Sequence, residues 1–207
     1  MSILGAFLTW HRFHTNHNPY TVNAVQSTLL MALGDTIAQH LEADGARYSE
    51  TDPLPEFDGY RLLALTTWAG CINAPFWTWW YKALEKRWPS GRVLGWVLSS
   101  AALSPPWNAA FFCWSTTASH LLKENGGLGE AGLHELQRKC AKKLDDQLVP
   151  TVSKSVCLWV PFNIINFSLV PLNYRMLSGG ITALAWNVFL SSVQARGSPQ
   201  SKENNLK

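Results

Sequence analysis

Long stretches of this sequence lack charged residues. Asp, Glu, Lys and Arg are absent from residues 13–34, 62–81, 93–122, 155–174 and 176–195, and each window is at least 20 residues long. A membrane-spanning helix needs about 20 mainly apolar residues, whereas a surface helix of a soluble protein carries charges on its outer face. The charge distribution therefore favours an integral membrane protein over a soluble helical protein, although the mean hydropathy of −0.04 is typical of soluble chains.

Motifs of common enzymes and cofactor sites are also missing. The sequence has no G-x-S-x-G, H-E-x-x-H or P-loop pattern, and its four cysteines form no C-x-x-C pair, which argues against zinc and redox motifs. Residues 127–132 fit G-x-G-x-x-G, but a charged K-E-N segment precedes them where a strand is required, so a linker is the better interpretation. We expect no enzyme activity, no cofactor and no nucleic-acid partner.

Three histidines near the N-terminus are the one candidate metal site. His11, His14 and His17 are three residues apart and can share one side of a helix, but no cysteine or acid lies near them. A solvated or headgroup-facing set of histidines is the simpler interpretation, and we expect no bound metal.

Apolar windows and proline positions predict an all-α fold. We expect helices at 20–41, 60–84 and 177–195, a window at 93–122 broken by Pro105 and Pro106, and a polar-lined segment at 159–175 bounded by prolines. Leucines at helical spacing with basic residues between them predict an amphipathic interfacial helix at 133–148. The expected architecture is an integral membrane helical bundle with four to five membrane-embedded helices plus this interfacial helix.

The domain organisation and the position of one membrane interface follow from the same pattern. Residues 1–18 form an N-terminal segment, 19–195 a single membrane-helical domain and 196–207 a disordered polar tail. Trp and Tyr followed by Lys82 mark a membrane interface at the end of the second helix. Small residues at Gly70 and Ala74, and at Gly179 and Ala183, predict close helix contacts.

Polar residues inside apolar segments are the candidate functional set. Asp35 and Gln39 share one helix face, as do Asn163 and Asn166, and we expect these two faces to meet inside the bundle. Arg175 is expected to pair with an acid or a lipid phosphate at the rim. These groups can be interhelical hydrogen-bond partners or the lining of an aqueous path, and the residues alone do not decide between the two.

Several motifs resemble those of the peroxisomal-membrane-protein-twenty-two and Mpv-seventeen family of small organellar membrane proteins. Gly34, Asp35 and Gln39 fit the family pattern G-D-x-x-x-Q, and Pro75 is followed by Trp80, Tyr81 and Lys82. The family patterns N-F-x-x-V-P-x-x-x-R and W-x-x-x-L-S are matched by Asn166, Phe167, Val170, Pro171 and Arg175, and by Trp186, Leu190 and Ser191. Three departures stand out: Asn163 replaces a family Gln, Pro161 is displaced by one residue, and Ser99-Ser100 replaces Asp-Gln.

The resemblance implies a multi-pass protein of the mitochondrial inner membrane, or alternatively of the peroxisomal membrane. It further implies a weakly selective small-solute channel with a role in organelle metabolite homeostasis. A non-conducting scaffold or partner-binding protein is the alternative. The expected partners are membrane lipid, small solutes and further copies of the same chain in a homo-oligomer.

Overall fold

The computed structural model describes residues 3–47, 56–87, 93–122 and 129–196, and every regular element in those ranges is helical. The elements are α1 (Ile3–His17), α2 (Pro19–Arg47), α3 (Gly59–Thr67), the π-helix η1 (Trp68–Asn73), α4 (Ala74–Arg87), α5 (Val93–Ala102), α6 (Ser104–Leu122), α7 (Glu130–Leu169) and α8 (Leu172–Arg196). The all-α prediction is therefore confirmed for the described part of the chain. The predicted tail from residue 197 onward lies outside it.

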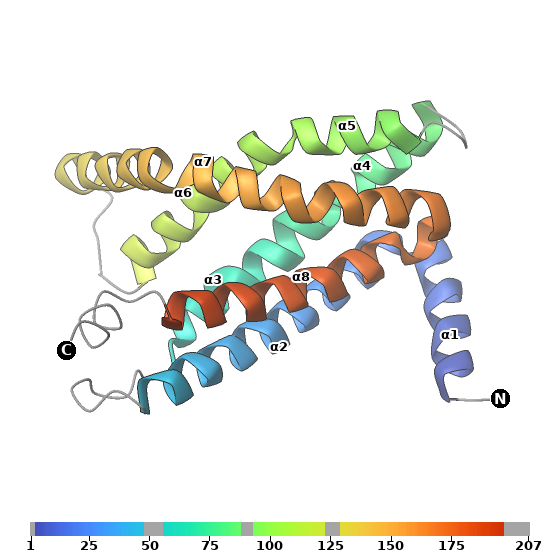
Figure 1. Cartoon of the computed structure of the whole chain (residues 1–207), viewed down its shortest axis with the longest axis horizontal. Coiled ribbons are helices and arrows are strands. Elements are labelled where there is room, and N and C mark those ends of the chain that lie inside the picture. The colour runs from blue at the N-terminus through green and yellow to red at the C-terminus, as the bar shows by residue number, and fades with distance from the viewer. Residues whose placement is uncertain (1–2, 48–55, 88–92, 123–128, 197–207) are drawn as a thin grey trace.

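The long helices run along one bundle axis. Figure 1 shows α2 and α8 side by side, with α7 next to α8 and α5 beyond it, while α1 crosses one end. The consecutive elements α3, η1 and α4 pack along α2, and α6 packs against α3 and α7. The described helices thus surround a common interior to which seven of them contribute side chains.

Prolines determine where several helices change. Pro75 has no N–H group, and the turn directly before it is the π-helix η1, in which the N–H of Ala74 donates to the carbonyl of Ala69. The predicted division of the 93–122 window occurs at Leu103, directly before Ser104 and the two prolines of the first turn of α6. Pro75 lies inside the helix expected at 60–84, and the structure shows a widened turn directly before it.

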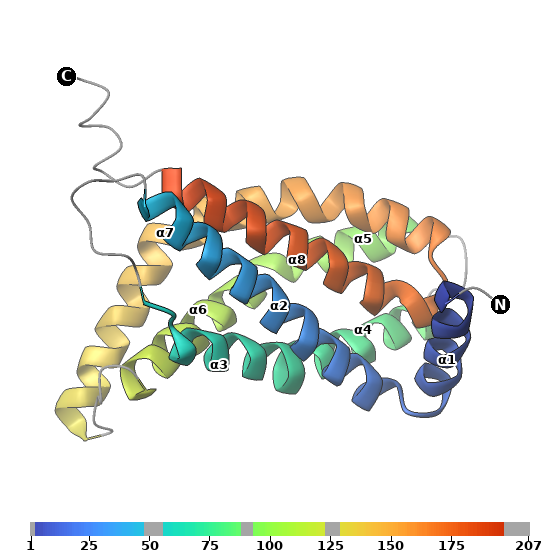
Figure 2. The same ribbon diagram turned by 90° about the horizontal axis from the view of Figure 1, so that it is seen from below.

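Two predicted boundaries are wrong. The helix expected at 133–148 is the first part of α7, a 40-residue helix that contains Pro150 and Pro161. Figure 2 shows that the two parts of α7 run in different directions, as expected for a helix that tolerates an internal proline by bending. The segment expected at 159–175 is not one element: α7 ends before Pro171, as its bounding proline predicted, and Arg175 lies near the start of α8.

The first part of α7 carries the basic cluster. Arg138 and Lys142 are exposed, Lys139 pairs with Glu135 at 3.0 Å, and Nζ of Lys143 donates to the hydroxyl of Ser115 on α6 at 3.0 Å. Partial burial against α6 lowers the pKa of Lys143 from its ordinary value. One basic residue is thus used for helix packing, while others face outward.

Large apolar side chains cover much of the outside of the bundle. Val25, Leu29 and Leu33 are 55%, 64% and 53% exposed and lie four residues apart on the outer face of α2. Leu94 and Leu98 on α5 repeat this pattern. Outward apolar stripes of this kind mark an interaction with lipid or another protein.

By length and composition one described helix, α7, is suited to crossing a membrane, so the prediction of four to five embedded helices stays a prediction.

Glycines allow two close helix contacts with α2. A Cβ on Gly70 of η1 would lie 2.3 Å from Oγ1 of Thr28, and one on Gly180 of α8 would lie 2.5 Å from a methyl of Leu30. The predicted contact at Gly70 is therefore present. On α8 the close contact is at Gly180. An added Cβ on Gly179 would meet nothing within 4 Å, and Gly179 lines a cavity.

Candidate functional site: a central cavity

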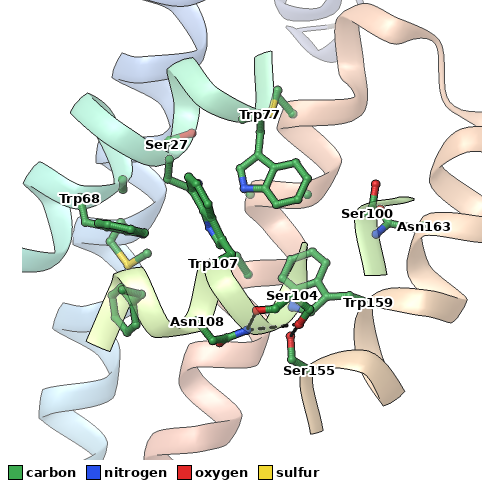
Figure 3. Close-up of a pocket in the computed structure, with 18 of the residues that line it drawn as sticks. Ser27, Trp68, Trp77, Ser100, Ser104, Trp107, Asn108, Ser155, Trp159 and Asn163 are labelled. Carbon is green, nitrogen blue, oxygen red and sulfur yellow. Dashed lines mark hydrogen bonds between the residues drawn. The ribbon is translucent and has the colours of Figure 1, made fainter. Parts of the chain in front are cut away.

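A cavity of about 240 Å³ lies in the middle of the bundle. Side chains from α2, η1, α4, α5, α6, α7 and α8 line it, and Figure 3 shows ten of them labelled. Its walls therefore come from segments throughout most of the chain. A cavity of this kind between helices of a bundle is a common place for a ligand site.

One wall of the cavity is aromatic. Trp107 of α6 is the centre of this wall, with its ring 5.4 Å from Trp68 and 5.7 Å from Trp77 between ring centroids. Phe76 stacks on Trp107 at 4.2 Å, and the indole N–H of Trp107 donates to Oδ1 of Asn73 at 3.2 Å. The π-helix contributes directly to this wall, since Trp68 and Asn73 are its first and last residues.

A second wall is built from hydroxyl and amide groups. Asn108 donates through Nδ2 to the carbonyl of Ser104 at 2.8 Å and to its hydroxyl at 3.2 Å. The Ser104 hydroxyl in turn donates to that of Ser155 at 3.4 Å, which links α6 to α7. Figure 3 shows this chain along one side of the cavity. The polar wall thus has both donors and acceptors.

Two further polar atoms at the cavity have no hydrogen-bond partner among the described residues. They are Oγ of Ser100 and Oδ1 of Asn163, whose residues are 6% and 9% exposed. A buried polar atom without a partner costs about 1–3 kcal/mol unless water or a ligand satisfies it. None of the described lining residues is charged. The cavity therefore suits water or small polar molecules better than ions.

Of the five polar residues predicted as pore-lining or interhelical, the structure places Asn163 at the cavity. Asn166 is fully buried, and its Oδ1 accepts a hydrogen bond from the Ser178 hydroxyl at 2.7 Å, between α7 and α8. The prediction that the Asn163 and Asn166 face meets Asp35 and Gln39 is wrong, because those two residues have partners elsewhere.

Asp35 and Gln39 belong to an ionic cluster where α2 meets the start of α3. Oδ1 of Asp35 lies 2.8 Å from Nε of Arg61, and Gln39 donates to Oδ2 of Asp35 at 2.8 Å. Arg61 also pairs with Glu42 at 2.9 Å, and Gln39 bonds the backbone of Asp58 as both donor and acceptor. Asp35 is 1% exposed. The cluster ties the beginning of α3 to α2.

Arg175 forms a second ionic cluster. Its Nη1 lies 3.1 Å from Oε2 of Glu85, and its Nε donates to the carbonyl of Val170 at 3.1 Å. The guanidinium also lies over the rings of Trp96 and Phe167, at 4.7 and 5.6 Å from their centroids. This cation therefore joins α4, α5, α7 and α8, and its acid partner is Glu85.

The N-terminal histidines do not converge. His11 is buried, with Nε2 2.8 Å from Oε1 of Gln26 and its ring stacked on Tyr174. His14 and His17 contact Phe13 on the outer side of α1. Within the described residues no group of three or more His, Cys, Asp or Glu side chains is placed to hold a metal ion.

Most of the cavity lining was not singled out from the sequence. Ser27, Ser104, Asn108 and Ser155 are small polar residues within apolar windows, where no charge or motif distinguishes them. The prolines were the usable signal in the sequence. Pro75 and the two prolines after Ser104 mark two irregular segments, and both segments contribute residues to the lining.

Comparison with known proteins identifies the family. The family model described as "Mpv17 / PMP22 family" matches residues 134–191. A Protein SYM1 of Mycosarcoma maydis is 30% identical, over 86% of this chain and 81% of its own length. The chain belongs to the Mpv17 / PMP22 family. Protein sym1 of Schizosaccharomyces pombe is 27% identical over 92% of this chain, and PXMP2/4 family protein 2 of Dictyostelium discoideum is 24% identical over 86%. No solved structure matches the chain.

Family membership confirms the resemblance drawn from the motifs and makes this chain an organellar membrane protein. The residues matched by the family model include Asn166, Pro171, Arg175 and Trp186. The structural motif residues differ in burial: Gly34 and Phe167 are buried, Pro75, Trp80 and Trp186 are half-buried, Pro171 is exposed, and Tyr81 is buried and lines the cavity.

Proposed function

We propose that this member of the Mpv17 / PMP22 family is a multi-pass protein of the mitochondrial inner membrane that lets small polar solutes pass through its central cavity. In this proposal four to five helical segments are embedded in lipid, and the first part of α7 lies at the membrane surface. The protein contributes to metabolite homeostasis of the organelle as a weakly selective channel and has no enzymatic role.

The uncharged cavity, with one aromatic wall and one wall of hydroxyl and amide groups, is the observation that carries the proposal. Its hydroxyl and amide wall replaces hydrogen bonds that a solute loses when it leaves water. Without a charged lining residue, the cavity provides no counter-charge for an ion. We therefore expect neutral polar solutes to pass more readily than ions of similar size.

Outward apolar stripes and the spacing of the ionic clusters support the embedding. The helical segments from Arg61 to Glu85 rise about 36 Å at roughly 1.5 Å per residue, and a hydrocarbon core is about 30 Å thick. The two ionic clusters then lie near opposite membrane surfaces. Exposed apolar residues such as Leu29, Leu63 and Ile181 would face lipid between them.

Reconstitution tests the channel directly. Purified full-length protein in liposomes is expected to let glycerol enter, measured as light-scattering recovery after an osmotic step, faster than in protein-free liposomes. Conductance in planar bilayers, measured in parallel, is expected to be low. Folded protein that gives neither solute entry nor conductance would contradict the channel and favour the non-conducting scaffold.

The membrane assignment needs a separate experiment. Fractionation of cells that express the tagged chain is expected to place it with inner-membrane markers of mitochondria and to show resistance to carbonate extraction. Protease protection of each terminus then gives the topology. Co-purification with peroxisomal membrane markers would replace the mitochondrial assignment and leave the channel proposal to the liposome measurement.

A further inference from the structure

A second cavity of about 160 Å³ lies next to the central one, at the end of the bundle where α1 turns into α2. Its outer wall includes Thr15, Asn16 and Pro19, and Lys82 is its charged lining residue. Asn23, 3% exposed, donates to the hydroxyl of Thr78 at 2.9 Å, and its Oδ1 has no partner within the described part of the chain. This cavity is therefore polar and lies at the interface end that the Trp and Tyr cluster before Lys82 indicates.

Two residues line both cavities: Tyr81 of α4 and Met176 of α8. They are 9% and 8% exposed and belong to the same buried cluster. Side chains that line two neighbouring cavities form the partition between them. A molecule that leaves the central cavity toward this end of the bundle must therefore pass between Tyr81 and Met176.

The two sides of this partition differ in their side-chain type and in the contacts that hold them. The Tyr81 ring is held by Phe167, at 5.5 Å and nearly perpendicular, and by Trp77 at 5.8 Å. Met176 has an unbranched side chain with three rotatable bonds and no ring contact of this kind, and methionine adapts readily to changing space. Rotation of Met176 can thus open the partition without moving a helix, whereas Tyr81 provides a fixed surface.

We propose that the second cavity is the vestibule of the solute path and that the Met176 side chain, closing against Tyr81, is its size-selective constriction. The inference rests on the channel function proposed above and adds a route and a limiting point to it. Small neutral polyols are the solutes that such a path suits, because the lining of both cavities offers hydroxyl and amide groups and a single charge, on Lys82.

Substitutions at the two methionines that line the central cavity distinguish a constriction at Met176 from a general loosening of the cavity lining. Met31 lines the central cavity but not the vestibule, so it is a matched control for Met176. Entry of glycerol, erythritol and sorbitol into proteoliposomes is measured for Met176→Ala and Met31→Ala, with the melting temperature of each. We expect Met176→Ala to speed entry several-fold, most strongly for sorbitol, and Met31→Ala to leave the dependence on size unchanged.

Leucine variants guard against a folding defect, since Met and Leu exchange with little loss of stability. Met176→Leu, which has fewer rotatable bonds, is expected to slow sorbitol entry more than glycerol entry, whereas Met31→Leu is expected to leave the ratio of the two rates unchanged. Equal rates and equal size dependence for the Met176 and Met31 variants, in a wild type that transports, would overturn the constriction alone. A folded wild type without any entry would overturn the channel and the constriction together.

Discussion

Arg175 and Glu85 join α8 to α4 through an ion pair of 3.1 Å, and the guanidinium of Arg175 lies on the ring of Trp96 at 4.7 Å. The exposures of the two partners differ: the side chain of Arg175 is 8% exposed and that of Glu85 is 39% exposed. The buried cation therefore keeps its aromatic and backbone contacts when the acid is removed, whereas removing the cation removes every contact at once.

This asymmetry predicts unequal effects of mutation. Arg175→Ala is expected to lower the free energy of unfolding by about 3–5 kcal/mol, because it removes the ion pair, a charge-assisted hydrogen bond to a backbone carbonyl and the buried cation–π contacts together. Glu85→Gln is expected to cost about 1 kcal/mol or less, because the carboxylate is partly screened by water. Thermal unfolding of both variants in detergent measures the difference. Equal losses would mean that the ion pair alone, without the Trp96 contact, explains the role of Arg175.

Asp35 is predicted to act on stability and not on transport. It bonds Arg61 and Gln39 away from the cavity lining. Asp35→Asn is expected to cost about 3 kcal/mol, the lower end for a broken buried pair, because Glu42 still partners Arg61. Glycerol entry per folded protein is expected to be unchanged. A changed solute preference in a normally stable Asp35→Asn protein would place this carboxylate on the path after all.

Gly70 is predicted to be intolerant of a side chain for a steric reason. Gly70→Ala would bring Cβ to 2.3 Å from Oγ1 of Thr28, and the variant is expected to be destabilised. Gly95→Ala on α5 is the control, since nothing lies within 4 Å of the added Cβ, and there alanine is expected to stabilise by about 0.5–1 kcal/mol.

A double mutant tests the proposed clash. Thr28→Ala removes the hydroxyl that the new Cβ of Gly70→Ala would meet, so the double mutant is expected to be more stable than the sum of the single effects predicts. Additive effects in melting experiments would show that Gly70 is required for the backbone of η1 and not for its contact with α2.

The helical class, the break near Pro105 and the family could be predicted from the sequence because each depends on local pattern. Charge-free windows and prolines act on their own segments, and Pro171 ends α7 as expected. The continuity of α7 could not be predicted, because Pro150 is compatible with either a bend or an end. Only the packed structure distinguishes these two outcomes.

The site was predicted less well, for a physical reason. Asp35, Gln39 and Arg175 stand out in the sequence because a charge or a large amide is costly in an apolar segment, and the structure satisfies them with local partners. The cavity depends on small groups such as Ser104 and Ser155, which cost little in any helix. Their convergence depends on how distant segments pack, and no spacing within one helix reveals it.

Passage of solute through the cavity lined by Ser155 can be tested with a pair of substitutions two residues apart. Ser155 is buried at the cavity, while Ser153 is exposed on the same helix. Glycerol entry into proteoliposomes is measured for Ser155→Leu and Ser153→Leu, with melting temperatures as the check of folding. Ser155→Leu is expected to abolish most of the entry in folded protein, and Ser153→Leu is expected to transport like wild type. Entry at the wild-type rate in Ser155→Leu would show that solute does not cross the bundle through this cavity.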